Sequence, residues 1–152
     1  MRKLGMVLAI ATGGAVAGGV VASRAAEPVS PVWFKPAAEV RTAFVKGQPL
    51  IERENYKVHA SHRDSAGKVE VHEADTDIVY VLEGTATFIT GGKMAGGQTI
   101  APEEVRGTSI DGGDTRELRP GDVVIVPAGV PHWFKTVTNP FNYYVVKVRK
   151  EH

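Results

Sequence analysis

Short apolar runs rich in β-branched and aromatic residues recur along the chain and predict β-strands. The clearest run is 78–82, which is too short for a helix and ends at the dipeptide Glu83-Gly84. Residues 85–90 form a second run, and the pair predicts a hairpin closed at Gly84. Both faces of the 78–82 run are apolar, which predicts a strand that is covered on its inner and outer sides.

Turn-forming residues separate these runs from other predicted strands. A polar turn is expected at 74–76, immediately before the central run. Residues 91–120 form a long, glycine-rich polar connection, and we expect this segment to be a flap over the mouth of a barrel. The remaining predicted strands lie at 50–51, 56–62, 123–126 and 143–148.

One amphipathic helix is predicted ahead of the strands. Pro36 suits a first helical residue and Gly47 suits a stop, so the helix is expected at about 36–46. Its apolar positions fall at helical spacing, namely Ala37, Val40, Ala43 and Phe44. Short strands, regular turns and one peripheral N-terminal helix predict an all-β fold, a single antiparallel β-barrel or jelly roll.

Length and composition limit the chain to one such barrel. The 152 residues, 43% of them hydrophobic, are enough for one core of ordinary size. The 17 glycines and 9 prolines are more than a helical bundle would have. We therefore expect three parts, which are a signal peptide at 1–26, a linker with the helix at 27–54, and the barrel at 55–149.

The first residues have the pattern of an export signal. Arg2 and Lys3 precede an apolar segment that extends to Ala22, and small-residue cleavage frames follow up to Ala26. An uncleaved membrane anchor is the alternative, but the segment has five glycines and few large side chains. We expect cleavage, a periplasmic or secreted product, and no membrane contact afterwards.

Charge and cysteine content exclude several classes of partner and chemistry. The formal charge is +1, and removal of Arg2, Lys3 and Arg24 with the leader leaves 15 basic against 17 acidic residues, or −2. A near-neutral chain without a basic run is not expected to bind nucleic acid. The absence of cysteine excludes disulfides, thiolate catalysis and zinc–thiolate sites.

Candidate ligand side chains gather in two separate segments. Glu70 and His72 fall on the same face of a strand, because side chains alternate along it. Asp77 opens the next strand, where it either contributes a ligand or caps the 74–76 turn. In the second segment, a rigid turn with two prolines and a glycine leads to His132.

The second segment resembles the second sequence motif of the cupin family. That motif has a Gly, five residues, Pro-x-Gly, two residues and a His, which match Gly121, Pro127, Gly129 and His132. The motif continues to an Asn four residues further on, where this chain has Thr136.

The first segment resembles the other cupin motif in a degenerate form. That motif has His-x-His, three or four residues, Glu, six residues and Gly. His72 fits the second His and Gly84 the final Gly, while Glu70 replaces the first His and Asp77 replaces the Glu. The resemblance to the family covers roughly residues 56–148, and the stretch 70–92 also resembles a group of small exported cupins.

The resemblance implies a barrel of six to eight strands with one divalent metal ion inside. The ligand set would be Glu70, His72, Asp77 and His132, which suits iron, manganese, zinc or nickel. Such a site leaves open positions that can polarise a carbonyl or bind water or dioxygen. Glu70 has three candidate roles, as a metal ligand, as a catalytic general base, or as the group that orients His72. Because the first His of the motif is missing, a barrel that binds no metal is the alternative.

Other side chains have both a functional and a structural interpretation. His59 could enter the barrel and replace the missing imidazole, whereas His62 falls on the opposite strand face. Five aromatic residues could line a pocket, although for most of them ordinary core packing is the preferred interpretation: Tyr80, Trp133, Phe134, Tyr143 and Tyr144.

Three functions are compatible with these patterns. The first is an exported metal-binding enzyme that acts on a small organic molecule by oxygenase, isomerase or lyase chemistry. The second is a non-catalytic module that binds a small molecule in the periplasm. The third is a structural component of a dimer, because the 78–82 strand is apolar on both faces; a homodimer is predicted on the same ground.

Overall fold

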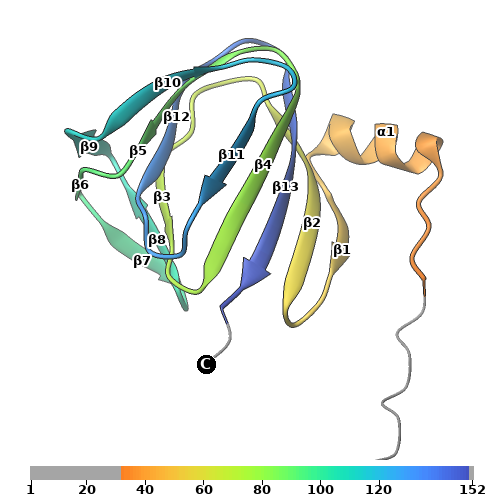
Figure 1. The fold of residues 1–152 in the computed structure, drawn as a ribbon, viewed down its shortest axis with the longest axis horizontal. Coiled ribbons are helices and arrows are strands. Elements are labelled where there is room, and N and C mark those ends of the chain that lie inside the picture. The colour runs from red at the N-terminus through yellow and green to blue at the C-terminus, as the bar shows by residue number, and fades with distance from the viewer. Residues whose placement is uncertain (1–31, 151–152) are drawn as a thin grey trace, which may run out of the picture. The chain divides into compact units, whose positions relative to one another are not determined.

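The structure is a computed structural model that describes residues 32–150 (Figure 1). The predicted signal peptide at 1–26, linker residues 27–31 and His152 lie outside the described residues. Within the described part, no helix is both long and apolar enough to cross a membrane.

Two large antiparallel sheets face one another and enclose the interior of the 34–152 unit (Figure 1). One sheet has the order β1 (Pro49–Glu52), β2 (Tyr56–Arg63), β13 (Phe141–Arg149), β4 (Asp75–Glu83) and β11 (Val123–Val126). The other has the order β10 (Asp114–Leu118), β5 (Ala86–Thr90), β12 (His132–Val137), β3 (Val69–His72), β8 (Glu104–Gly107) and β7 (Gln98–Ala101). A small third sheet pairs β6 (Lys93–Ala95) with β9 (Ser109–Asp111). The all-β jelly-roll prediction is confirmed.

Residues 32–150 contain one helix, α1 (Ala37–Lys46), which lies outside the barrel beside β1 and β2 (Figure 1). It ends before Gly47, as predicted, but begins one residue later than expected, because Pro36 has an extended backbone and is the N-cap. At its C-terminus, Gly47 N–H donates to Phe44 O at 3.2 Å, and Gln48 N–H donates to Ala43 O at 3.0 Å. Ala43 is buried, and Phe44 packs edge-on against Tyr144 of β13 with ring centroids 5.0 Å apart.

Strand alternation divides the interior into an apolar end and a polar end. Along β4, the inward positions change from Asp77 to the buried Val79 and Val81. The same change occurs on β12, where the buried His132 is followed on the same face by the core residue Phe134. The apolar core therefore closes one end of the barrel, and the polar side chains face a cavity at the other end.

The predicted hairpin at Gly84 is wrong, because β4 and β5 belong to different sheets. At Gly84 the chain crosses from the five-stranded to the six-stranded sheet with a φ of +80°. A Cβ at this position would lie 2.3 Å from Pro140 O and 2.4 Å from Thr138 Oγ1, so only glycine fits. The sequence indicated a tight turn here, but sheet partners depend on distant strands.

Two further expectations about β4 are corrected. The turn before it comprises Glu73 and Ala74, whereas Asp75 and Thr76 already belong to the strand. Asp75 is buried and accepts a hydrogen bond from Arg149, which explains why it is not in a polar turn.

The outer face of β4, which was expected to be covered, remains partly exposed, with Tyr80 at 43% and Leu82 at 38%. The described chain does not cover this face, and the homodimer stays a prediction.

The 91–120 segment is a sheet extension, so the predicted flap is wrong for most of its length. It contains β6 to β10, of which β8 pairs along the whole of β3 and β10 pairs with β5. Glycine and polar residues concealed these short strands in the sequence. Inward-facing Glu104 and Arg106 of β8 line the cavity together with Ile100 of β7.

Candidate metal centre

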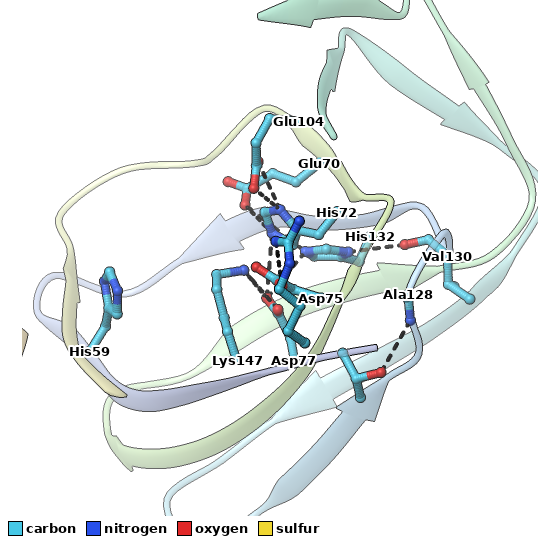
Figure 2. A network of polar contacts seen from close by, with 12 residues as sticks. His59, Glu70, His72, Asp75, Asp77, Glu104, Ala128, Val130, His132 and Lys147 are labelled. Carbon is cyan, nitrogen blue, oxygen red and sulfur yellow. Dashed lines mark hydrogen bonds and ion pairs between the residues drawn. The ribbon is translucent and has the colours of Figure 1, made fainter. Parts of the chain in front are cut away.

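Backbone contacts bring the two predicted ligand segments together at one end of the barrel. His132, the first residue of β12, is the register partner of Glu70 in β3. The 127–131 turn is attached to the end of β3, because Gly129 N–H donates to His72 O at 2.8 Å. Gly129 has a φ of +82°, a conformation that favours glycine. The turn places His132 next to His72 (Figure 2).

Three side chains converge closely enough to share one ion. Glu70 Oε2 lies 3.5 Å from His72 Nε2 and 3.9 Å from His132 Nε2. One ligand atom from each residue falls within 4.8 Å of the other two. Metal bonds of about 2.0–2.2 Å place ligand atoms roughly 3–4 Å apart, so small side-chain movements would complete a site. Two imidazoles and one carboxylate suit iron, manganese, zinc or nickel.

Hydrogen bonds at Nδ1 orient both imidazoles toward this shared point. His72 Nδ1 lies 2.8 Å from each carboxylate oxygen of Glu104, and His132 Nδ1 lies 3.1 Å from Val130 O (Figure 2). Both acceptors require a proton on Nδ1, which leaves the lone pair on Nε2. A carboxylate behind a histidine is a common arrangement at metal sites.

His72 Nε2 has no hydrogen-bond partner among the described residues, although it is buried. The nearby carboxylate oxygens of Glu70 and Asp77, at 3.5 and 3.4 Å, lie at ion-pair distance without hydrogen-bond geometry. Buried polar atoms are rarely left unpaired. The orphaned nitrogen beside Glu70 and His132 therefore fits a metal ion.

Two arginines keep Glu70 ionised. Arg63 Nη2 lies 3.2 Å from Glu70 Oε1, and Arg106 Nη2 lies 3.8 Å from Glu70 Oε2. Burial alone would raise the pKa of Glu70, but contact with His72 and the charges of Arg106 and Arg63 lower it well below its usual range. An ionised carboxylate is a good ligand and a weak general base at neutral pH, which favours the ligand role of Glu70.

The two histidines differ in their electrostatic environments. Burial lowers the pKa of His72, but the neighbouring carboxylates of Glu70 and Asp77 outweigh this effect and raise it above 6.5. Burial dominates at His132 and lowers its pKa. His132 therefore stays neutral to lower pH than His72, and protons compete with a metal ion mainly at His72.

Asp77 approaches the site from the opposite sheet but already has a cationic partner. Its Oδ2 lies 3.4 Å from His72 Nε2 and 3.9 Å from His132 Nε2. Both of its oxygens also accept from Lys147 Nζ, at 2.7 and 2.9 Å (Figure 2). The ammonium group would compete with an ion for this carboxylate, so the three-residue set is the better candidate. Asp77 lies within β4, which excludes the predicted turn-capping role.

These side chains face a cavity of about 380 Å³ between the two sheets. Cavities of about 300–1,000 Å³ are typical of small-molecule sites. Phe134 and Tyr143 form part of its apolar wall and also belong to the core. The centre therefore lies in a cavity whose inner end is closed by the apolar core.

Comparison with known proteins identifies the family. Residues 54–152 match the cupin family model. The chain belongs to the cupin family. A Bacillus halodurans protein aligns with a TM-score of 0.56 and 16% identity, over 80% of this chain and 85% of that one. A Ralstonia eutropha protein provisionally named mannose-6-phosphate isomerase aligns with a TM-score of 0.50 and 22% identity, over 68% of this chain and 83% of that one. At these identities the similarity shows the fold alone. No curated protein matches the sequence.

The departures of this cupin from the family motifs have different structural consequences. Thr136, in the place of the motif Asn, is exposed and donates to Thr87 Oγ1 at 2.7 Å, away from the metal centre. Glu70, in the place of the first motif His, lies within the ligand group. The degenerate first motif therefore puts a carboxylate in the candidate ligand group, while Thr136 does not belong to that group.

The remaining candidates from the sequence lie on both sides of the barrel wall. His59 lines the cavity but is not part of the ligand group, and His62 faces outward, with Nδ1 2.8 Å from Asn142 Oδ1. The outward-facing aromatics are Tyr80 and Tyr144. Trp133 donates from Nε1 to Gly67 O at 2.8 Å and does not line the cavity.

Four cavity residues that contact the candidate ligands were not predicted: Arg63, Glu104, Arg106 and Lys147. Period-two alternation could have identified Lys147, because it shares a strand face with Tyr143 and Val145. Glu104 and Arg106 repeat the spacing of Glu70 and His72, but their strand was hidden in the long polar connection.

Loss of the Glu104 carboxylate is expected to weaken metal binding without removing a ligand. Glu104→Gln removes the charge that holds the Nδ1 proton of His72, so we expect metal affinity to fall about 10- to 100-fold. Competition with a chelating dye measures this change. Glu117→Gln, an exposed substitution in β10, serves as the control and is expected to bind like the wild type. Equal affinity in the two variants would contradict the orienting role of Glu104.

Proposed function

We propose that this cupin is an exported metal-dependent enzyme that acts on a small organic molecule. The observation that carries this proposal is the buried, unpartnered Nε2 of His72, which faces Glu70 and His132 in the cavity. Glu70, His72 and His132 would hold the ion. When bound, a divalent ion with open positions can polarise a carbonyl or bind water or dioxygen, which covers isomerase, lyase and oxygenase chemistry.

The surrounding residues prepare this compartment for chemistry. Glu104 and Val130 fix the orientation of the two imidazoles through Nδ1. Arg63 and Arg106 keep Glu70 in its charged form. The aromatic core beneath the centre excludes water from the closed end of the barrel, where electrostatic interactions become stronger.

Export is proposed from the N-terminal pattern of Arg2 and Lys3, an apolar segment and small-residue cleavage frames. Cleavage after this segment would release a periplasmic or secreted product.

A non-catalytic binding module is the second candidate. The observation that favours it is that both candidate ligand carboxylates already form ion pairs. Arg63 and Arg106 pair with Glu70. Lys147 pairs with Asp77. These charges are balanced without a metal ion. Such a cupin would bind a small molecule in the same cavity and release it unchanged.

Elemental analysis combined with a turnover assay distinguishes these functions. The purified full chain is freed of metal with a chelator, reloaded separately with Fe²⁺, Mn²⁺, Zn²⁺ or Ni²⁺, and dialysed. We expect about one ion per chain for at least one metal. Small organic compounds are then followed by NMR and oxygen uptake, with and without that metal. Metal-dependent turnover supports the enzyme. Ligand binding without turnover supports the binding module, and absence of stoichiometric metal overturns the metal-dependent function.

A further inference from the structure

The cavity has a second polar region, on the five-stranded sheet, that takes no part in the ligand group. It comprises Lys57 and His59 of β2 and Lys147 of β13, all of which line the cavity. Lys57 and Lys147 are register partners on neighbouring antiparallel strands, so both side chains are on the inward face. We name these three residues the cationic wall.

Two lysines directly opposite one another repel, which destabilises a sheet unless an anion is nearby. Lys147 has such an anion, because Asp77 accepts from its Nζ at 2.7 and 2.9 Å. Lys57 is half-buried, and no carboxylate of residues 32–150 lies within ion-pair distance of it. Glu52, its register partner on β1, instead points its carboxylate to within 3.5 Å of His59 Nε2. Lys57 is therefore the member of the cationic wall that carries a charge without a contact ion pair among residues 32–150, while the Glu52 carboxylate lies beside the wall.

His59 adds an unused hydrogen-bonding atom to this wall. Its Nε2 is buried and has no hydrogen-bond partner in the described part of the chain, since the 3.5 Å approach of Glu52 lacks hydrogen-bond geometry. Burial lowers the pKa of His59, and the charges of Lys147 and Lys57 lower it further against the opposing effect of Glu52. A neutral imidazole can donate one N–H to an acceptor in the cavity.

The charged residues that line the cavity also bear on the charge of its occupant. Four lining residues are cations (Lys57, Arg63, Arg106 and Lys147), three are carboxylates (Glu70, Asp77 and Glu104), and a fourth carboxylate, Glu52, lies 3.5 Å from the lining residue His59. Each of the three carboxylates already contacts one of the cations other than Lys57. A divalent ion at the metal centre would increase the positive charge. With that ion bound, the excess of positive charge would attract an anionic occupant in preference to a neutral one.

We propose that the cavity binds a small organic carboxylate, whose anionic group is held by Lys57 and His59 opposite the metal centre. This inference rests on the proposed function in taking the occupant to be the molecule that the enzyme or binding module receives. One unmatched lysine suits a singly charged carboxylate better than a phosphate dianion. Lys57 supplies the charge and His59 an N–H, while Lys147 remains with Asp77.

Paired probes that differ only in charge test this proposal. The zinc-loaded full chain is titrated calorimetrically with benzoate against benzamide and with lactate against lactamide. We expect at least one carboxylate to bind about tenfold more tightly than its amide, because a half-buried ammonium group forms a strong charged hydrogen bond. Inorganic phosphate is titrated in parallel and is expected to bind more weakly than that carboxylate.

Variants assign the preference to the cationic wall. Lys57→Met keeps the length of the side chain and removes its charge, so we expect carboxylate affinity to fall about tenfold and amide affinity to stay unchanged. Lys93→Met, an exposed substitution in β6, is the matched control and is expected to keep the preference. The proposal is overturned if the wild type does not prefer either carboxylate, if phosphate binds more tightly, or if Lys57→Met keeps the full preference.

The zinc content of the same samples separates this inference from the proposed function. Lys57 is not in the ligand group, so Lys57→Met is expected to retain its zinc. A chain that takes up none of Fe²⁺, Mn²⁺, Zn²⁺ and Ni²⁺ but shows a Lys57-dependent preference for carboxylate would overturn the metal-dependent function and leave the anion site standing. A chain that binds zinc without this preference would overturn the anion site alone.

Discussion

His132→Ala is expected to abolish stoichiometric metal binding. The substitution removes one of two imidazoles whose Nε2 atoms face Glu70, and in residues 32–150 no other histidine belongs to the ligand group. The remaining histidine and carboxylate cannot complete a facial set of three ligands. After metal loading and dialysis, we expect elemental analysis to show a drop from about one ion per chain to less than about a tenth.

His62→Ala is the matched control for this experiment. It removes the same side chain from an outward-facing position beside Asn142, so metal content is expected to equal that of the wild type. Circular dichroism of both variants verifies that the strands remain folded. A folded His132→Ala protein with wild-type metal content would show that the ion, if bound, lies elsewhere.

Of the substitutions proposed for this chain, Phe88→Ala is expected to cause the largest loss of stability. Phe88 is fully buried on β5, faces its register partner Phe134 on β12 with ring centroids 4.5 Å apart, and belongs to the core that closes the barrel. Truncation removes apolar contacts and leaves a cavity among rigid strands. Such changes lower the free energy of unfolding by about 3–5 kcal/mol, which urea unfolding of the full chain measures.

Phe34→Ala provides the comparison at an exposed position. Phe34 is 81% exposed, so the same truncation there is expected to change the free energy of unfolding by no more than about 0.5 kcal/mol. Equal losses for the two variants would mean that the aromatic core is not the main source of stability.

Local patterns in the sequence predicted individual elements better than their partners. The helix ended at Gly47 as expected, because a helix stop depends on a few neighbouring residues. Gly84 correctly marked a tight turn, but the sequence could not show that β4 and β5 join different sheets. That arrangement depends on β13 and β12, which are distant in the chain.

At the candidate site too, the sequence predicted individual residues better than the contacts between them. The family motifs identified Glu70, His72 and His132, which the structure brings together. They did not reveal that Lys147 holds Asp77 or that Glu104 holds His72, because these contacts span 70 and 32 residues and depend on strand register. Alternation predicts which way a side chain faces, whereas register decides which side chains meet.

The hydrogen bond from Gly129 N–H to His72 O joins the two ligand segments through main-chain atoms only. This connection is therefore available whichever side chains occupy positions 70, 72 and 132. We therefore expect a lineage with this scaffold to be able to exchange ligands one codon at a time while this link between the segments persists. The same property makes the barrel a suitable starting point for protein engineers who wish to install new coordination chemistry.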